Sequence, residues 1–433
     1  MKKVIFLIVI VLSIIFDSTV CNAVNLKDYN LSESDISGLS EKNFLGLTKE
    51  QMLEDYEYYW KTVNENCPLI SLSERQNKIS ESYETYKQKL LNSESNLEQM
   101  ECIVKLSDCL SGHPSYMPSI SDLKKVYGKY IDIRKTWYDK LLDPLSEKNN
   151  NLYKFFKEKN LNPIEDTKNV DQGDKLIDEN IETKIIEDGN IAYMKIRSFG
   201  NQFINQDTEK QIFNFYSDIK DFKNLIIDIT GNSGGDTNYL VDYIFPILCD
   251  KLVIKDYFLL KMGNENKSFI KEAFSKDNIS ILPTSELPEF KALNALDKNE
   301  MTHFLPIEWT IVPKKRVDFH GKIWLLVDEK VFSTSESLAS ACKENGCAVL
   351  VGKRTGGDGV GIDPALLVLP NSKIVFRYSM IYGLNVDGSC NAEVGTEPDI
   401  ISKEGESPLD TCLNEISSAN LSQKNWKSWG KLV

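Results

Sequence analysis

The hydrophobic residues follow two different periods along the chain, and the change falls near residue 189. Between about Leu26 and Ser119, apolar residues recur three and four positions apart in LTKEQMLEDYEYYWKTVNENCP and LEQMECIVKLSDCLSG, which end in proline and glycine. This spacing gathers the apolar side chains on one face of a helix, and proline and glycine are common helix terminators. We therefore predict a small helical bundle over residues 24–119.

From residue 189 onward, short β-branched runs bounded by turn residues alternate with helical segments. The runs are NIAYMKIRSF, NLIIDIT, KIWLLVD, CAVLVG, ALLVLP and KIVFRYS, and the helical segments are NYLVDYIFPILCDKL and SESLASACKENG. Such alternation is typical of α/β domains, and continuous apolar strands indicate a sheet covered on both faces. We predict one α/β domain over residues 189–410, a polar connecting region over residues 120–188 and a C-terminal tail over residues 411–433.

The first 23 residues have the layout of a signal peptide. Lys2 and Lys3 precede an apolar run from Val4 to Phe16, and small residues follow around Ala23. The run is short for a membrane span. A retained anchor helix and a lipoprotein attached through Cys21 are the alternatives. We expect an exported protein, secreted or extracytoplasmic in the cell envelope, whose membrane association is transient and through the leader only.

Composition sets limits on the partners of the remaining chain of about 410 residues. Hydrophobic residues make up 41% of the chain, which is enough to build a core. The chain has 64 acidic and 51 basic side chains, and its net charge of -13 would repel a phosphate backbone. We therefore expect no nucleic acid partner.

Cysteine and histidine usage argues against a metal site. The chain has nine cysteines, none in a C-x-x-C pair, and only three histidines, His113, His303 and His320. A Cys/His zinc site thus lacks both ligand spacing and ligands. The eight cysteines outside the leader permit disulfides in an exported protein, but their pairing cannot be deduced from sequence.

The segment KIWLLVDEKVFSTSESLA, residues 322–339, takes an apolar strand directly into a serine cluster that opens a helix. A serine at such a turn points outward beside backbone N–H groups that have no helical partner, which suits a nucleophile next to an oxyanion site. Ser333 is the candidate. The alternative is a capping box, because Ser333 and Glu336 have the required spacing.

A second candidate element is IIDITGNSGGD, residues 226–236. Here a buried strand ends in Gly231, Asn232, Ser233, Gly234 and Gly235 before a helix, and glycine leaves the backbone N–H groups uncovered. Such a loop can hold a developing negative oxygen. It lacks the lysine that a phosphate loop requires, and an ordinary tight turn is the alternative.

A third candidate is His113, which lies between Gly112 and Pro114 at the end of the helical region. Histidine titrates near neutral pH and can act as a general base. A role in packing or capping is the alternative. Neither His303 nor His320 lies in a better context for catalysis.

Five segments, taken in order, resemble tail-specific (C-terminal processing) serine proteases. They are GNIAYMKIRSF, LIIDITGNSGGD, LLVDEKVFSTSE, CAVLVGKRTGG and EVGTEPDI, and the resemblance extends over essentially all of residues 189–400. The segment LSDCLSGHPSY is similar to the aspartate-x-histidine segment of the branch related to tricorn protease and retinoid-binding protein repeats. The resemblance implies a ClpP/crotonase-like core of βα units, with Ser333 as the nucleophile.

This chain departs from the bacterial processing proteases at the base. In that branch, a lysine in the glycine-rich stretch after the next strand deprotonates the serine. The corresponding position here is Asp358, whose ionised carboxylate cannot replace a neutral amine, and Lys353 lies a few residues earlier. The histidine branch is the better match, which implies His113 as base and Glu393 as the group that steadies it. Glu393 is one residue off the expected spacing from Gly395.

Two further departures concern substrate selection and the strand-end loop. Residues 120–188 show neither the glycine-rich carboxylate-binding loop of a PDZ domain nor enough strand-like segments, so a PDZ domain is not supported. Thr230 stands where the family often has arginine.

The resemblance predicts an exported serine-type peptidase that needs no cofactor and acts on polypeptides. Ser333 would form an acyl-enzyme with His113 as general base, and the oxyanion would be held by the N–H groups of Thr334 and of Gly234 or Gly235. One alternative is an inactive relative that binds apolar or peptide ligands. Another is an esterase that acts on small substrates.

Overall fold

The computed structural model describes residues 45–112, 115–117, 180–273, 280–362 and 364–429. The predicted signal peptide, His113 and nearly all of the predicted connecting region lie outside these residues. No helix in the described part of the chain combines the length and apolar character that crossing a membrane requires.

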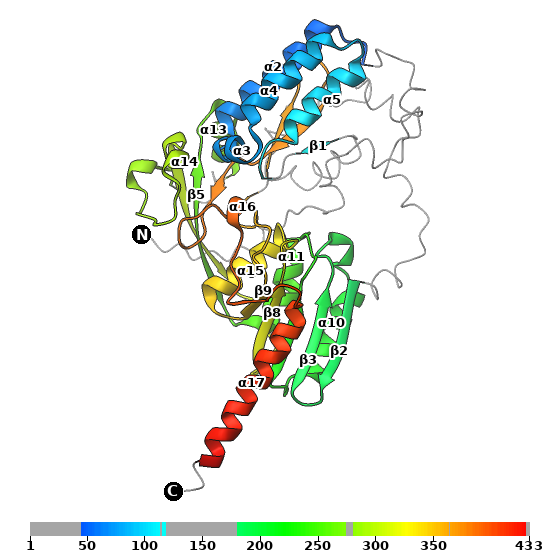
Figure 1. The fold of residues 1–433 in the computed structure, drawn as a ribbon, viewed down its shortest axis with the longest axis vertical. Helices are drawn as coiled ribbons and strands as arrows, with labels where there is room; N and C mark the ends of the chain where they lie inside the picture. Colours follow the sequence, from blue (N-terminus) through cyan, green and yellow to red (C-terminus); the bar gives the residue numbers. More distant parts are fainter. Residues whose placement is uncertain (1–44, 113–114, 118–179, 274–279, 363, 430–433) are drawn as a thin grey trace.

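The N-terminal region is helical, as the period of its apolar residues predicts (Figure 1). Thr48 caps the first helix in a capping box with Gln51, and Ser95 accepts a hydrogen bond from the Glu98 N–H to cap the last one. One short strand, β1 (Ser115–Met117), also falls within the predicted helical region. The helices are α2 (Lys49–Asn66), α3 (Ile70–Asn77), α4 (Ile79–Asn92) and α5 (Asn96–Ser107).

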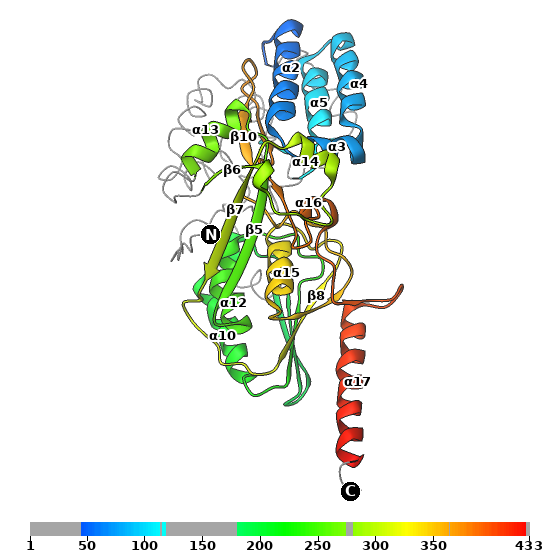
Figure 2. The same ribbon diagram turned by 90° about the vertical axis from the view of Figure 1, so that its left-hand side faces the viewer.

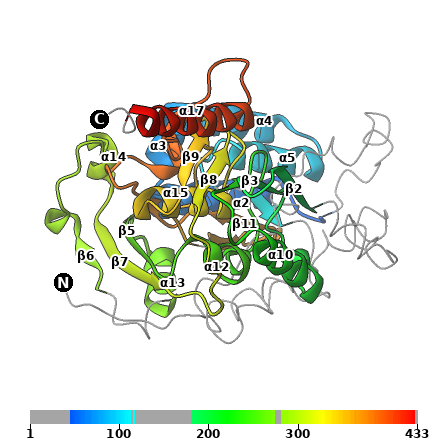
Figure 3. The ribbon, with the colours of Figure 1, turned by 90° about the horizontal axis from the view of Figure 1, so that it is seen from below.

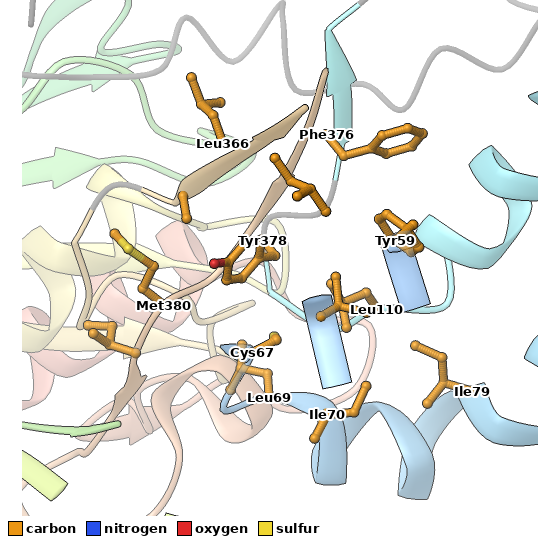
Figure 4. Close-up of a cluster of buried hydrophobic side chains, with 14 of the residues drawn as sticks. Tyr59, Cys67, Leu69, Ile70, Ile79, Leu110, Leu366, Phe376, Tyr378 and Met380 are labelled. Carbon is orange, nitrogen blue, oxygen red and sulfur yellow. The ribbon is translucent and has the colours of Figure 1, made fainter. Parts of the chain in front are cut away.

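The helical region shares one hydrophobic core with strands from the C-terminal half of the chain (Figure 4). The ring of Tyr59 lies 5.0 Å from the ring of Phe376, measured between centroids. The buried carboxylate of Asp55 accepts hydrogen bonds of 2.8 Å from the backbone N–H groups of Asn371 and Ser372. Because polar and apolar contacts both cross this junction, the helices are fixed relative to these strands.

A six-stranded sheet forms the centre of the α/β part, in the order β13-β9-β8-β4-β3-β2. Neighbouring strands are parallel except for the antiparallel pair β2 and β3. The sheet begins at Ile181, before the predicted boundary at residue 189. Its strands are β2 (Ile181–Glu187), β3 (Ile191–Ile196), β4 (Asn224–Asp228), β8 (Lys322–Val327), β9 (Val349–Gly352) and β13 (Ile400–Ile401).

Helices cover both faces of this sheet, which confirms the expectation from its continuous apolar strands (Figure 3). Cys412 and Ile416 of α17 (Pro408–Trp429) pack against one face, and the rest of α17 projects away from the body (Figure 2). The other face is covered by α10 (Gln206–Asp218), α11 (Thr237–Tyr239), the π-helical turn η4 (Leu240–Ile244), α12 (Phe245–Leu248) and α15 (Thr334–Asn345).

Two smaller sheets join this core to the helical region. The first has the order β12-β5-β7-β6 and is built on the long antiparallel pair β5 (Leu252–Leu260) and β7 (His303–Ile311), with β6 (Leu282–Pro283) and β12 (Tyr382–Gly383) beside them. The second has the order β1-β11-β10, with β10 (Ala365–Val368) and β11 (Val375–Tyr378). The remaining elements are η3 (Asn201–Phe203), α13 (Asn264–Ala273), η5 (Thr284–Glu286), α14 (Ala295–Glu300) and α16 (Asn391–Val394).

Candidate active site

Ser333 lies at the turn between β8 and α15 in a backbone conformation that is rare for a residue with a side chain. Its φ is 55° and its ψ is -125°, and its N–H donates to the carbonyl of Gly357 at 3.1 Å. A non-glycine residue at positive φ is strained, and such strain recurs where a fold must present a reactive side chain. The predicted strand-to-helix turn is therefore present, and it holds Ser333 under strain.

The capping-box interpretation of Ser333 does not hold. Ser333 occupies the N-cap position of α15, but its side chain accepts no hydrogen bond from the helix. Glu336 is fully buried and binds elsewhere, so it does not reach back to the N-cap residue. The hydroxyl of Ser333 is thus not used to stabilise the helix.

The glycine loop after β4 lies directly against this turn. A Cβ atom on Gly234, whose φ is 109°, would lie 2.9 Å from the carbonyl oxygen of Phe332 and 3.0 Å from the N atom of Thr334. A Cβ atom on Gly235, whose φ is 139°, would collide with the backbone of Phe199. Both positions therefore require glycine. Gly234 allows the loop to lie against the Ser333 turn, and Gly235 allows it to lie against the backbone of Phe199.

The N–H groups of the two glycines have different partners. The Gly234 N–H donates to Oδ1 of Asn232 at 2.9 Å, and the same oxygen accepts from the Ser335 hydroxyl at 2.7 Å. The Gly235 carbonyl accepts from the Thr334 hydroxyl at 2.7 Å. Within the described residues, the N–H groups of Gly235 and Thr334 donate no hydrogen bond. These two N–H groups are the ones available to an incoming oxygen.

Asn232 is a functional position that sequence reasoning missed. It is fully buried, and its side-chain amide also donates to the carbonyl of Ile196 at 3.1 Å. It thereby connects β3, the glycine loop and the first turn of α15. The only sequence signal was a lone amide among glycines, which is equally typical of an ordinary turn.

Glu336 lies in a buried polar network beneath the N-terminus of α15. Its Oε1 accepts hydrogen bonds of 2.6 Å from the Asn391 side-chain amide and from the Thr396 hydroxyl. Burial raises the pKa of Glu336 to about 7, against an ordinary value of 4.5, and the carboxyl of Asp358 adds to the increase. Asn391 also accepts a hydrogen bond of 2.8 Å from the Gly359 N–H. This bond links α16 to the loop that contains Gly357, whose carbonyl accepts from the Ser333 N–H.

The residues that could replace the processing-protease lysine are placed as follows. Asp358 lies between Gly357 and Gly359, with a φ of 60°. Lys353 is half-exposed, and its Nζ lies 3.6 Å from the carboxylate of Glu329 at the surface. No contact between Lys353 and Ser333 occurs in the described part of the chain.

Glu393 lies in α16 and is paired with a cation from the N-terminal region. Arg75 of α3 contacts Glu393 Oε2 through Nη2 at 3.0 Å and also binds both carboxylate oxygens of Asp297. Asp297 is fully buried and accepts a further hydrogen bond of 2.7 Å from the Tyr382 hydroxyl. The Asp297 and Glu393 carboxylates raise the pKa of Arg75, which keeps its charge.

Thr230, in the position that is often arginine in the resembled family, is braced by another cation. Lys195 of β3 donates to the Thr230 hydroxyl at 3.0 Å and lies 3.3 Å from the Asp228 carboxylate. Asp228 in turn accepts from the Thr230 N–H at 2.8 Å. The end of β4 is thus held by a lysine from the adjacent strand.

His113 lies outside the described residues, but both of its flanks are placed. A Cβ atom on Gly112 would collide with the side chain of Ser379, and Ser115 pairs with Arg377 across β1 and β11. Of the histidines in the described part, His303 lies in β7 beside Thr302, and His320 is exposed beside Asp318. Neither has a contact with the Ser333 turn. In the same part of the chain, no three of the usual ligand side chains gather closely enough to hold a metal.

The arrangement of a strained serine beside bare N–H groups agrees with the comparison with known families. Residues 190–402 match the model of peptidase family S41. This match identifies residues 190–402 as a serine-type peptidase domain. The resemblance to tail-specific proteases is thereby confirmed, and the matched residues are the S41 domain from here on. No curated protein matches the chain in sequence.

Solved structures similar to the chain include proteins that extend over most of its length. A candidate peptidase from Parabacteroides merdae ATCC 43184 is 17% identical with a TM-score of 0.50, over 84% of this chain and 96% of the other. A lipoprotein from Streptococcus agalactiae is 13% identical with a TM-score of 0.41, over 85% and 96%. Tricorn protease is 12% identical with a TM-score of 0.36, over 84% and 35%. The first likeness shows that the S41 domain and the helical region share an overall fold with that protein.

Proposed function

We propose that the S41 domain hydrolyses peptide bonds through an acyl-enzyme on Ser333, with the oxyanion held by the N–H groups of Gly235 and Thr334. The observation that carries this proposal is a strained serine beside two residues, Gly235 and Thr334, whose N–H groups donate no hydrogen bond and which are joined by the bond from the Thr334 hydroxyl to the Gly235 carbonyl. Donors fixed in advance stabilise developing charge without reorganisation, and one such donor contributes roughly 2.7–4 kcal/mol. Gly234 supports the site through Asn232 and not as a donor.

We assign the general base to His113. Lys353 is engaged with Glu329 at the surface, and Asp358 offers a carboxyl where the processing proteases have an amine. The placement of Gly112 also supports the assignment. Gly112 lies against the side chain of Ser379. Two residues further along the chain, Ile381 lies 3.9 Å from the position of a Cβ atom on Gly361. Gly361 follows Gly357, whose carbonyl accepts a hydrogen bond from the Ser333 N–H. Gly112, the residue before His113, is therefore packed against the segment after β11, and this segment contacts the loop that contains Gly361.

Glu393 has two roles to distinguish. The prediction that it steadies His113 stays a prediction. Its ion pair with Arg75 supports a second role, in which it anchors α16 and so keeps Asn391 against Glu336. Both roles maintain the geometry of the site, but only the first acts on the proton that the base carries.

The setting of the reaction follows from the same reasoning. The leader-like N-terminus supports export and a secreted or extracytoplasmic location, and a ClpP/crotonase-like arrangement of βα units is the fold that we assign to the S41 domain. Polypeptides are the proposed substrates. An extended chain could pair with a free strand edge, which provides main-chain hydrogen bonds without sequence selection.

A fluorophosphonate probe tests the nucleophile, and mass spectrometry locates the adduct. We expect a covalent adduct on Ser333 in the wild-type protein, reduced labelling in His113→Ala and unchanged labelling in Lys353→Ala. A wild-type protein that folds but resists the probe would support the inactive binding relative instead. Hydrolysis of small esters with no cleavage of an unstructured polypeptide would support the esterase.

A further inference from the structure

Three cysteine side chains meet at the C-terminal ends of two helices on one face of the six-stranded sheet. Cys249 directly follows α12, Cys342 lies in the last turns of α15, and Cys347 follows that helix after Gly346. The thiol of Cys347 lies near enough to those of Cys249 and Cys342 for its own pKa to be shifted by both. All three belong to the apolar cluster beneath that face.

The backbone around these thiols is fixed by contacts that do not involve sulfur. Asn345 accepts a hydrogen bond of 3.0 Å from the Val253 N–H, and Glu344 accepts one of 2.9 Å from the Lys255 N–H. The start of β5 is therefore held against the end of α15, only a few residues from Cys249 and Cys347. A disulfide requires Cα atoms within about 7 Å and side chains that face each other. Two neighbouring thiols on segments held together by these hydrogen bonds favour that geometry.

Exposure distinguishes the pair that can be oxidised. Cys249 and Cys347 are half-buried, whereas Cys342 is fully buried. The contact with Cys347, followed by burial, raises the pKa of the Cys249 thiol. For Cys347, the contact with Cys249 lowers the pKa, but the contact with Cys342 and burial raise it more strongly. Both thiols are mainly protonated at neutral pH, so the bond would form slowly unless a disulfide reagent drives the exchange.

We propose that Cys249 and Cys347 form a disulfide when the protein meets a disulfide oxidant. The two thiols lose two protons and two electrons as their S–S bond forms. The S–S bond of the oxidant breaks, and its two sulfurs leave as thiols. Cys342 stays a buried thiol beside the new bond.

The proposed bond lies at the C-terminal ends of two helical segments whose N-terminal ends begin at the candidate active site. The run from α11 to α12 begins directly after Gly235 and Asp236, and α15 begins directly after Ser333. The disulfide would tie the two helical runs together at their far ends and close a loop of roughly 100 residues, for which the chain-entropy model predicts substantial stabilisation. An effect of the disulfide on the oxyanion donors rests on the proposed function. The formation of the disulfide does not.

Peptide mapping tests the bond in the full-length protein. The protein is treated with glutathione disulfide, free thiols are alkylated, and the digest is analysed without reduction. We expect a linked peptide pair that contains Cys249 and Cys347, with Cys342 alkylated after denaturation. An alkyl group on both Cys249 and Cys347, or a link between Cys342 and Cys347, would overturn the proposal. The readout is independent of activity, so it stands apart from any failure of the peptidase assignment.

Thermal unfolding provides the second measurement. Reduction of the oxidised wild-type protein should lower its Tm by about 5–15 °C, and the Cys249→Ser/Cys347→Ser variant should show no such change. Cys412→Ser is the matched control, because Cys412 is a buried thiol on the opposite face of the sheet and the variant should keep the full shift. Equal Tm values for oxidised and reduced wild-type protein would contradict the proposal.

Discussion

The side-chain hydroxyl of Thr334 donates a hydrogen bond of 2.7 Å to the carbonyl oxygen of Gly235. This bond joins the first residue of α15 to the glycine loop that follows β4, two segments that are distant in the sequence. It also fixes the two residues relative to each other, and the N–H groups of these residues are the proposed oxyanion donors. In the proposed mechanism, the oxyanion donors are thus positioned by the side chain of Thr334.

Thr334→Val should lower kcat about 10- to 100-fold with a small change in KM. The variant keeps the shape of the side chain but leaves the Gly235 carbonyl without its donor, so the donors lose alignment at the step where charge develops. Steady-state hydrolysis of an unstructured polypeptide measures the effect. Thr334→Ser keeps the hydroxyl and should stay within a few-fold of wild type. An unchanged kcat in Thr334→Val would separate this bond from catalysis.

Asn232→Ala should destabilise the protein by about 2–4 kcal/mol. The substitution leaves the Gly234 N–H and the Ser335 hydroxyl without their shared acceptor in a fully buried site, and each buried unsatisfied group costs about 1–3 kcal/mol. Urea unfolding measures the change. Asn414→Ala, at an exposed position in α17, should stay within about 0.5 kcal/mol of wild type. Similar stabilities for the two variants would refute the bracing role of Asn232.

Much of the nucleophile's setting could be predicted from sequence because it is local. The turn at Ser333 and the glycine loop each follow a buried apolar strand, and this pattern is contained in a few consecutive residues. The contact of Asn391 with Glu336 could not be predicted in this way, since the two residues meet only through the fold. Glu336 also had a local explanation as a capping residue, which the structure overturns by burying it.

The antiparallel pair β5 and β7 was missed for a different reason. The predicted helix NYLVDYIFPILCDKL extends to Leu252, where β5 begins, so helical periodicity concealed the start of the strand. Pro306 lies within β7, and a proline in an apolar run argues against a strand inside a sheet. The strand is nevertheless formed, because its neighbours β5 and β6 provide pairing along the rest of its length.

Glu336→Gln should remove one component of the pH dependence of stability. Burial holds the pKa of Glu336 near 7, so the folded protein keeps this proton between about pH 4.5 and 7 while the unfolded chain releases it. The wild-type protein should therefore lose stability through this group as the pH rises across that window, by up to about 3 kcal/mol. Glutamine keeps an acceptor for Asn391 and Thr396 but does not ionise.

Urea unfolding of both proteins from pH 4.5 to 8 checks this expectation. Other carboxyls titrate in the same window, among them Asp256, whose pKa burial also raises to about 7. The informative quantity is thus the difference between wild type and Glu336→Gln, which should grow as the pH rises. A difference that does not change with pH would show that Glu336 has no unusual ionisation.

Arg75→Ala should destabilise the protein by about 3–5 kcal/mol, because it leaves the buried carboxylate of Asp297 without its cation. Equilibrium unfolding measures the loss. Lys78→Ala is the matched control, since Lys78 is an exposed neighbour whose ion pair with Glu81 should contribute little. If Arg75→Ala were as stable as Lys78→Ala, the link between the helical region and α14 would not depend on this ion pair.

Ser333→Ala shows whether Ser333 is the nucleophile of a peptidase. The measurement is the rate at which purified wild-type and variant protein cleave an unstructured polypeptide, with circular dichroism to confirm that both are folded. We expect cleavage by the wild type and a loss of at least about 10³-fold in the folded variant. Cleavage by Ser333→Ala at the wild-type rate would contradict it.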